Sequence, residues 1–370
     1  MRLGIDAREI ERGVSTGIGR ALFNFLRYAS ETLHNDRLTL FSSRPLPFSF
    51  GSRIENHVML EDSTRFWDQV KLPLAMKNQR IEVFYSPYYK LPLLTKARCV
   101  CAVLDLIYLR FPKYRSLLGY QGALYYHTFG RMCLNKARKI LTCSQFSKDD
   151  IMKVYGISRK KIEVIPLSVS SAYSPDTDAV RREAVKAGFG IRGRYLLYAG
   201  NFKEHKNVPV LLEAFRQMEG YQDLQLVLVG PRDAGAVRLT RQAEELGIDG
   251  QVVFTDRIVD ETVMRTLYSG AELFVMPSLY EGFGLPPVEA MACGTPVVCS
   301  KATSLPEAVG DAAVMIDATR PEEIAHAAVE VLRNDTLRKE LVRRGVVRAA
   351  QLSEQSLSKR MFDFLRDMVL

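Results

Sequence analysis

Short apolar runs alternate with helical stretches along most of the chain, and this pattern predicts two parallel sheets. The first series of apolar runs is at residues 3–5, 38–41, 81–85, 100–104 and 139–142. The second series is at residues 195–200, 224–230, 252–254, 273–276, 295–299 and 313–316. Apolar strands separated by helical patterns are typical of parallel α/β sheets. We therefore expect an α/β protein.

A polar stretch separates the two series of strands and indicates a domain boundary. Residues 167–194 carry Ser168, Ser170, Ser171, Ser174, Pro175 and Asp176. We expect a first domain at residues 1–170, a linker at 171–193 and a second domain at 194–355. A chain of 370 residues suits two domains of ordinary size better than one.

Composition narrows the class of protein. Hydrophobic residues make up 47% of the chain, yet no apolar run approaches the ~20 residues that span a bilayer. Residues 1–6 have the character of a short strand rather than of a signal peptide. The six cysteines lack metal-type spacing, so we expect buried free thiols and a cytoplasmic location.

The net charge of +9 suits an anionic partner. The candidates are a nucleotide diphosphate, an anionic membrane surface and nucleic acid, beside a dispersed excess that serves only solubility. Zinc-finger spacing, RNA-binding strand motifs and basic-zipper patterns do not occur in the sequence, so we expect no nucleic acid as a partner.

Chemistry concentrates at residues 272–296, where a predicted buried strand leads through a glycine-rich turn into a helix. Pro286 and Pro287 suit the first turn of that helix, whose free backbone N–H groups would bind an anion. Glu281 and Glu289 would repel a phosphate but can accept hydrogen bonds from vicinal hydroxyls. A nucleotide-sugar, with a diphosphate between two polyols, meets both demands. The plainer alternative is a surface loop whose glutamates complement the helix dipole.

The same segment resembles the donor-site signature of retaining glycosyltransferases of the GT-B fold, family four. The resemblance implies two Rossmann-like doubly wound domains facing across a cleft. The first would bind the acceptor and receive a final helix, at about residues 356–370, that crosses back. In the donor domain, Glu281 would contact the transferred sugar and Glu289 the nucleotide ribose. The amides expected near the sugar and diphosphate belong to Gly282, Phe283, Gly284 and Leu285.

A lysine-containing turn follows the first strand of the second domain. The family usually has a lysine just before an asparagine or glycine at this turn, which implies that Lys206 offsets charge on the leaving diphosphate. The family often has an arginine directly after the strand glycine, where this chain has Asn201. We assign Asn201 and Lys203 to the donor site. The charge of the leaving diphosphate is then neutralised by Lys206 alone, or by Lys206 together with Lys203 or Arg20. For Lys203, a solvated position in the loop is an equal alternative.

Two further loops complete the expected donor site. Gly17 and Gly19 lie between the first strand and a helix that Arg20 opens. The resemblance places this loop over the donor diphosphate, although a lone Gly-x-Gly is often only a tight turn. Thr255 follows a strand of the second domain, in a loop whose backbone usually touches the nucleotide base in the family.

The first domain departs from the family pattern at Leu104. The family commonly has a histidine at this position, before an aspartate, and that histidine contacts the transferred sugar. Asp105 either binds an acceptor hydroxyl or caps the following turn, and the two interpretations have equal weight. Ser144 or Ser147 is expected only to cap the next helix.

We expect no metal and no other cofactor. Paired aspartates that flank one residue, the metal–diphosphate signature of the other glycosyltransferase fold, are missing near a predicted cleft strand. Asp149 and Asp150 stand at a helix start and have the character of solvated residues. Transfer would then be metal-independent, with Lys206, Glu281 and Asp105 as the candidate catalytic residues.

The resemblance implies retaining transfer by front-face attack, in which the departing phosphate takes the acceptor proton. Residues 278–286 look most like mannosyltransferases of bacterial polysaccharide assembly, which favours GDP-mannose as donor and UDP-glucose as second choice. The acceptor would be a glycan or a lipid-linked saccharide. The alternatives are a sugar-nucleotide epimerase of the same fold and a nucleotide-binding module that has lost transfer, which Leu104 suggests.

Aromatic and basic residues interleave from residue 107 to residue 139. Aromatic side chains suit a bilayer interface, and basic ones attract anionic headgroups. Two interpretations stay open. Arg110, Lys113 and Arg115 bind the inner face of the cell membrane, or the aromatic residues pack inside the first domain while the charges are solvated.

Overall fold

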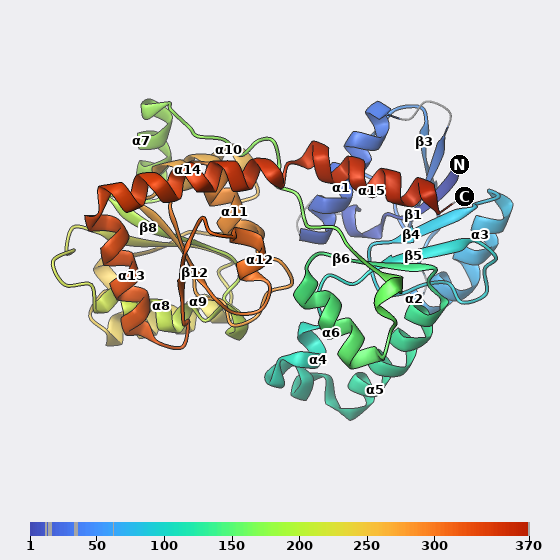
Figure 1. The fold of residues 1–370 in the computed structure, drawn as a ribbon, viewed down its shortest axis with the longest axis horizontal. Helices are drawn as coiled ribbons and strands as arrows, with labels where there is room; N and C mark the ends of the chain where they lie inside the picture. The colour runs from blue at the N-terminus through green and yellow to red at the C-terminus, as the bar shows by residue number, and fades with distance from the viewer. Residues whose placement is uncertain (12, 14–16, 33–35, 62, 369–370) are drawn as a thin grey trace. The chain divides into compact units, whose positions relative to one another are not determined.

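The computed structural model describes residues 1–11, 13, 17–32, 36–61 and 63–368, and only the backbone at residues 112, 113, 115–121 and 123. The chain forms two compact units (Figure 1). Unit 1 comprises Met1–Ser168 and Glu354–Leu370, and unit 2 comprises Val169–Ser353.

Unit 1 contains a parallel sheet with the strand order β3-β2-β1-β4-β5-β6-β7. Its strands are β1 (Arg2–Asp6), β2 (Arg37–Ser42), β3 (Ile54–Val58), β4 (Val83–Ser86), β5 (Arg98–Ala102), β6 (Lys139–Thr142) and β7 (Ile162–Val164). Its helices are α1 (Gly17–Thr32), α2 (Thr64–Phe66), α3 (Leu72–Asn78), α4 (Ile107–Arg110), α5 (Pro112–Lys136), α6 (Gln145–Tyr155) and α15 (Glu354–Asp367). Shorter helical turns are η1 (Arg8–Ile10), the π-helical η2 (Trp67–Lys71) and η3 (Arg159–Lys161).

Strands β1, β2, β4, β5 and β6 of unit 1 are buried on both faces because alternate side chains enter two separate cores. Val83 and Tyr85 of β4 join one core with α1 and α15, while Phe84 joins the other with α3, α5 and α6. Side chains along a strand point to opposite faces in turn, so a strand covered on both sides is apolar throughout. This explains why continuous apolar runs predicted β1, β2, β4, β5 and β6.

Unit 2 contains a parallel sheet with the strand order β10-β9-β8-β11-β12-β13. Its strands are β8 (Tyr195–Ala199), β9 (Gln225–Val229), β10 (Val252–Phe254), β11 (Leu273–Met276), β12 (Val297–Ser300) and β13 (Val314–Ile316). Its helices are α7 (Ala179–Gly188), α8 (Val208–Arg216), α9 (Ala234–Glu245), α10 (Glu261–Gly270), α11 (Leu285–Ala292), α12 (Leu305–Val309), α13 (Pro321–Arg333) and α14 (Asp335–Gln351), with the 3₁₀ turns η4 (Glu204–Lys206) and η5 (Asp249–Gln251).

The segment expected as a linker, residues 171–193, belongs to unit 2 instead. It contains α7, and the buried carboxylate of Asp176 binds Arg181 at 2.9 Å and Thr266 of α10 at 2.7 Å. These hydrogen bonds tie a stretch of polar sequence to the domain surface, which composition alone does not indicate. The change of unit occurs between Ser168 and Val169.

The final helix, α15, packs on α1 in unit 1 (Figure 1). Phe362 and Leu365 enter the core that α1 shares with β1. Strands β3 and β7 were not predicted from the sequence. β3 is mostly exposed and β7 has Glu163 between its two apolar residues, so neither provides a buried apolar run.

Parallel sheets of this type place ligands beyond the carboxyl ends of their strands, where the strand order reverses. That point lies between β1 and β4 in unit 1 and between β8 and β11 in unit 2. All six cysteines are free and buried, which confirms the prediction about the thiols. In the part of the chain that the structure describes, no helix is long and apolar enough to cross a membrane.

Candidate active site

The glycine-rich turn after β11 leads directly into α11, whose first two positions contain proline, as predicted. Gly284 has a φ of +98°, and a Cβ atom at this position would lie 2.5 Å from Cδ2 of Leu305. Both observations favour glycine, because other residues rarely adopt this φ and a Cβ atom would force the Leu305 side chain to shift. The turn therefore packs tightly against Leu305, the first residue of α12.

Glu281 forms an ion pair with Lys206, at 2.5 Å between Oε1 and Nζ. Each side chain is only 12% exposed, so the pair is shielded from water. The two residues come from the loops after β11 and β8, at the point where the strand order reverses. Burial, and after it the Glu281 carboxylate, raises the pKa of Tyr198 in β8 well above its usual value. The structure thus brings together the two side chains that the sequence assigned to the sugar and the leaving group.

The backbone of Glu281 is held from the loop after β12. Thr303 accepts a hydrogen bond from the Glu281 N–H at 3.0 Å, and the Ser304 hydroxyl donates to the Glu281 carbonyl at 2.8 Å. Thr303 has a φ of +55°, unusual for a residue other than glycine. Neither residue forms part of a recognisable motif, so this contact could not be predicted from the sequence.

Glu289 lies on α11 and is buried, with 5% of its surface exposed. Its Oε2 accepts a hydrogen bond from the hydroxyl of Tyr268 at 2.9 Å. Burial, followed by the nearby Glu289 carboxylate, raises the pKa of Tyr268 well above its usual value, so the hydroxyl stays protonated and donates. Tyr268 was also missed from the sequence, since it resembles any aromatic residue on the buried side of a helix.

The other predicted residues of unit 2 take part mainly in local contacts. Asn201 Oδ1 accepts from the Lys203 N–H at 3.1 Å, and Lys203 itself is exposed. The hydroxyl of Thr255 donates to the Asp256 carbonyl at 2.8 Å. Burial, together with Lys206 and Lys203, lowers the pKa of His205 to about 3, so His205 is neutral beside the two lysines.

In unit 1, Gly17, Gly19 and Arg20 lie in the first turn of α1, which begins at Gly17. The expected loop is therefore the start of the helix, three residues earlier than predicted. Gly17 is exposed and Arg20 is half-buried. Residues 14–16, which precede them, lie outside the described residues.

A cavity of about 510 Å³ lies at the carboxyl ends of β1, β4 and β5 in unit 1. Leu104 and Asp105 form part of its wall. Asp105 Oδ1 accepts from the N–H of Ile107 at 3.1 Å, the contact expected of a turn cap, and its place on the wall keeps the acceptor role open. The remaining wall is rich in tyrosine and includes Tyr88, Tyr89, Tyr108 and Tyr126.

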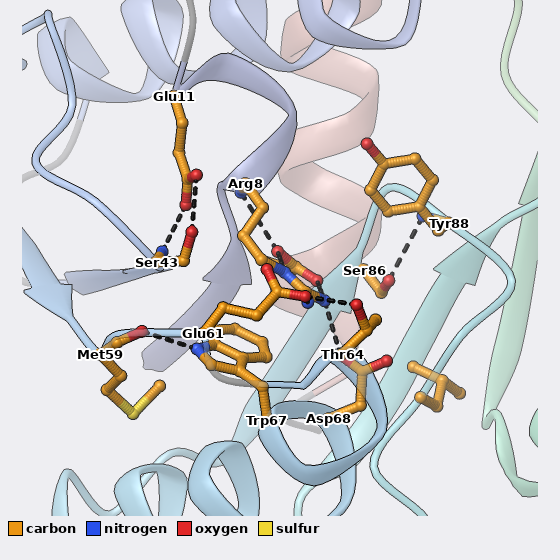
Figure 2. Close-up of polar contacts among 12 residues, drawn as sticks. Arg8, Glu11, Ser43, Met59, Glu61, Thr64, Trp67, Asp68, Ser86 and Tyr88 are labelled. Carbon is orange, nitrogen blue, oxygen red and sulfur yellow. Dashed lines mark hydrogen bonds and ion pairs between the residues drawn. The ribbon is translucent and has the colours of Figure 1, made fainter.

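One side of this cavity rests on an arginine cluster that the sequence did not reveal (Figure 2). The Arg8 guanidinium donates to Asp6 and Asp68, each at 2.6 Å, and lies 3.8 Å above the ring centre of Trp67. Burial opposes the charge on Arg8, but the two aspartates outweigh it and raise its pKa. Burial also disfavours the charged form of Asp68 and raises the pKa of its carboxyl, although Arg8 acts in the opposite direction. The cluster joins the loop after β1 to the helical segment that begins at α2.

The aromatic and basic residues of the stretch that begins at residue 107 have different surroundings. Tyr108 and Tyr126 stack on each other at the cavity wall, and Arg110 binds Asp150 at 3.1 Å. Asp150 is buried, so the expectation that it is solvated was wrong. The side chains of Lys113 and Arg115 lie outside the described residues. The described aromatic residues of this stretch are exposed or half-buried, Tyr108 with 47% of its surface exposed, so both interpretations stay open.

Ser144 caps α6 by accepting a hydrogen bond from the N–H of Ser147 at 3.0 Å, as predicted. Within the described ranges, no group of three or more His, Cys, Asp or Glu side chains is placed to hold a metal ion. Metal-independent transfer stays a prediction.

Two family models together match most of the chain. The family model "Glycosyl transferases group 1" matches residues 181–347, and "Glycosyltransferase Family 4" matches residues 16–172. The chain is 31% identical to "O-antigen chain mannosyltransferase B" of Escherichia coli over 302 residues, which are 81% of this chain and 76% of that protein. It is 29% identical to "Serotype-specific mannosyltransferase WbdA" of Escherichia coli, over 59% of this chain and 27% of that protein.

Solved structures show the same fold at low sequence identity. "Crystal structure of Anabaena Alr3699/HepE in complex with UDP and glucose" has a TM-score of 0.79 at 16% identity, over 99% of this chain and 100% of that one. "Crystal Structure of Glycosyltransferase from Rickettsia africae ESF-5" has a TM-score of 0.78 at 15% identity, over 100% of this chain and 98% of that one.

Proposed function

This chain belongs to glycosyltransferase family 4, the group 1 glycosyltransferases, with a GT-B fold, and on this premise we propose that it is a retaining hexosyltransferase that uses a nucleoside diphosphate sugar. The observation that carries the proposal is the shielded Glu281–Lys206 ion pair beside the N-terminus of α11. It combines a cation for a diphosphate with a carboxylate for sugar hydroxyls in one place.

Three parts of unit 2 divide the donor between them. Glu289 accepts hydrogen bonds from the ribose diol, and Tyr268 holds its carboxylate in position. The N–H groups of Gly282, Phe283, Gly284 and Leu285, ahead of the two prolines of α11, bind the diphosphate at the favourable end of the helix dipole. Lys206 stabilises the negative charge that develops on the leaving oxygen, where exclusion of water strengthens the interaction.

Glu281 orients the transferred sugar through its hydroxyls. The bond between the anomeric carbon and the diphosphate oxygen breaks, and the bond to the acceptor oxygen forms on the same face. The acceptor proton moves to the departing phosphate, so the reaction needs no protein nucleophile. This order of steps retains the anomeric configuration. Lys206 stabilises the negative charge on the leaving diphosphate throughout.

Mannose is the proposed sugar, and GDP-mannose the first candidate donor. The support comes from the two relatives from Escherichia coli, whose names describe mannosyltransferases, one of them acting on an O-antigen chain. We extend this to polysaccharide assembly for the present chain. UDP-glucose is the second candidate, because a protein of the same fold is described in complex with UDP and glucose.

The tyrosine-rich cavity of unit 1 supports an acceptor site. Aromatic rings such as Tyr88 and Tyr126 offer flat apolar surfaces to a sugar ring, and Asp105 offers oxygen atoms to its hydroxyls. We propose a glycan or a lipid-linked saccharide as the acceptor. A cytoplasmic location is consistent with six free thiols.

The decisive experiment measures donor turnover with and without a mannan or lipid-linked oligosaccharide acceptor. GDP-mannose and UDP-glucose are compared, and the anomeric configuration of the product is read by NMR. Acceptor-dependent transfer with retention, unchanged by EDTA, is the expected result. Epimer formation without an acceptor would instead identify an epimerase, and nucleotide binding without turnover would identify a binding module. A rate that collapses in EDTA would reveal a metal requirement.

A further inference from the structure

The guanidinium of Arg8 is held in one position from several sides (Figure 2). Its Nε and Nη2 atoms donate to the two carboxylate oxygens of Asp6 at 3.0 and 2.6 Å, and Nη2 also donates to Asp68 at 2.6 Å. The ring of Trp67 lies against it, with the ring centre 3.8 Å from the guanidinium carbon. Asp6, Trp67 and Asp68 are all buried, so these contacts are shielded from water. The guanidinium is therefore fixed in place without a ligand, which lowers the entropy cost of binding one.

The third nitrogen of this guanidinium, Nη1, keeps both of its N–H groups available. A guanidinium has five N–H donors, and the two aspartates take the three on Nε and Nη2. Oε1 of Glu61 lies 3.7 Å from Nη1, which is beyond hydrogen-bond distance, and no other described residue accepts from Nη1. Arg8 forms part of the wall of the tyrosine-rich cavity, and 13% of its side chain is exposed. Two donors of a fixed cation are thus available to a ligand in this cavity.

Glu61 provides a hydrogen-bond acceptor beside these donors, and it also forms part of the cavity wall. The hydroxyl of Thr64, at the start of α2, donates to Oε1 of Glu61 and holds the carboxylate. No residue that the structure describes donates to its Oε2 atom. A donor and an acceptor therefore stand side by side, but they are too far apart to satisfy each other. A hydroxyl group can serve both, because its oxygen accepts from Arg8 while its hydrogen is donated to Glu61.

The charges around this part of the cavity disfavour an anion, although the chain as a whole is basic. Among the described residues, the charged groups on the wall and directly behind Arg8 are two cations and four carboxylates: Arg8, Lys90, Asp6, Glu61, Asp68 and Asp105. The carboxylates outnumber the cations even when Asp68, whose pKa is raised by burial, is left out. A phosphate would be repelled by this excess, and an ionised phosphate has no hydrogen to donate to Glu61.

We propose that Arg8 and Glu61 bind a hydroxyl group of a neutral saccharide acceptor and exclude acceptors with an anionic group at this position. The inference rests on the proposed use of this cavity as the acceptor site. Tyrosine rings of the same cavity, such as Tyr126, offer flat faces to the sugar ring while its hydroxyl bridges Arg8 and Glu61. For a lipid-linked saccharide, the sugar end enters the cavity and the phosphate stays outside. Arg8 thus determines acceptor specificity, besides joining β1 to the segment that begins at α2.

Fluorescence of Trp67 reports directly on this position, because Trp67 is the only tryptophan of the chain and lies against Arg8. The full chain, without a donor, is titrated with α-linked trisaccharides of mannose, glucose and galactose. The same trisaccharides with a terminal phosphate are the matched anionic probes. We expect a saturable change in fluorescence with at least one neutral trisaccharide. Its phosphorylated form should bind about tenfold more weakly or worse, because of the carboxylate excess and the unsatisfied Glu61.

Two variants and a control separate recognition from a structural role. Glu61→Gln keeps the size of the side chain but removes its charge, so the phosphorylated probe should gain about tenfold relative to the neutral one. Arg8→Lys keeps the positive charge but loses the fixed fork, and it should weaken binding of the neutral probe about 10- to 100-fold. Calorimetry is used for Arg8→Lys, which alters the surroundings of Trp67. Glu55→Gln, at an exposed residue of β3 outside the cavity wall, is the control and should bind as the wild type does.

Three results would overturn the proposal. The first is a wild type that responds to none of the neutral trisaccharides. The second is equal or tighter binding of the phosphorylated probes, which would assign Arg8 and Lys90 to an anion. The third is wild-type selectivity in a Glu61→Gln variant that circular dichroism shows to be folded. Donor turnover is measured separately: saccharide binding without transfer would contradict only the transferase proposal, and transfer without a fluorescence response would contradict only this one.

Discussion

Glu281 and Glu289 lie close together in the sequence, but their side chains have different surroundings. Glu281 meets the charged Lys206 at 2.5 Å, whereas Glu289 meets the neutral hydroxyl of Tyr268 at 2.9 Å. The first carboxylate forms an ion pair, and the second accepts a hydrogen bond in a buried position. The two surroundings suit the two proposed tasks, binding the sugar for Glu281 and binding the ribose for Glu289, and single substitutions can separate them.

Replacing Glu289 by alanine should weaken binding of the nucleoside diphosphate about 10- to 100-fold, because its proposed partner, the ribose diol, loses both carboxylate acceptors. Isothermal titration calorimetry measures the change. Tyr268→Phe is the matched control: it keeps the carboxylate but removes the hydrogen bond that holds it, so its effect should be smaller. Wild-type affinity in a folded Glu289→Ala variant would remove this residue from the site.

Glu281→Ala should reduce transfer while leaving affinity for the nucleoside diphosphate nearly intact, because its proposed partner is the sugar. Calorimetry with the diphosphate and a turnover assay with the complete donor are done on the same preparation. A variant that loses nucleotide affinity but retains turnover would reverse the roles of Glu281 and Glu289.

Lys206→Ala should lower the turnover number on the order of 10²-fold or more, since the developing charge on the leaving group loses its shielded cation. Lys203→Ala is the control, because Lys203 lies three residues away in the same turn but is exposed. Equal losses in the two variants would show that the loop as a whole matters rather than the ion-paired lysine.

At the scale of elements, the site depends on loops that hold one another. The turn after β11 is held by Thr303 and Ser304 from the loop after β12, and it packs on Leu305 through Gly284. Loops beyond parallel strands are free to vary in sequence, so a fixed geometry there requires specific contacts. Gly284 supplies one of them by having no side chain.

Gly284→Ala should destabilise unit 2 and impair donor binding, because the new methyl group would lie 2.5 Å from Leu305 and the residue would keep a φ of +98°. We expect a loss of more than about 1 kcal/mol in the free energy of unfolding. Chemical denaturation measures it, with Gly250→Ala as control because nothing lies within 4 Å of its added Cβ. Equal stability of the two variants would contradict the packing argument.

Whether a strand could be predicted from the sequence depended on how deeply it is buried. Strands such as β11, with all four residues buried, gave clear apolar runs. The edge strand β3 did not, since most of its side chains face solvent. Motif residues were found because they are contiguous, as from Glu281 to Glu289. The residues that hold the motif were not found, because Tyr268 and Thr303 lie outside it and have no distinctive sequence context. The contact between Arg8 and Asp68 was also missed, because the two residues are 60 positions apart.

At the scale of the whole molecule, the order of the chain and the division into units differ. Unit 2 is one continuous stretch, but unit 1 is completed by α15 after unit 2 has ended. Leu365 is fully buried in the core beneath α1, and Phe362 contributes beside it. The last helix is therefore a structural part of the first unit.

Leu365→Ala should destabilise unit 1 by about 2–5 kcal/mol through the cavity it leaves. Hydrogen exchange read by mass spectrometry distinguishes the units: β1 and α1 should lose protection, while β9 and β11 should keep theirs. Val346→Ala on α14, at a side chain 42% exposed, is the control and should change little. Equal loss of protection in both units would contradict the assignment of α15 to unit 1.

The split composition of unit 1 also determines when it can mature during translation. Residues 1–168 emerge from the ribosome before any part of unit 2, yet the surface of α1 that receives Phe362 and Leu365 stays uncovered until α15 has been made. At about 5–20 residues per second, synthesis of residues 169–353 leaves that surface open for roughly 10 to 40 seconds. Unit 2 can close its own core within this interval. The nascent chain therefore exposes an apolar helix face to chaperones for most of its synthesis, and the unit that is made first is the last to be finished.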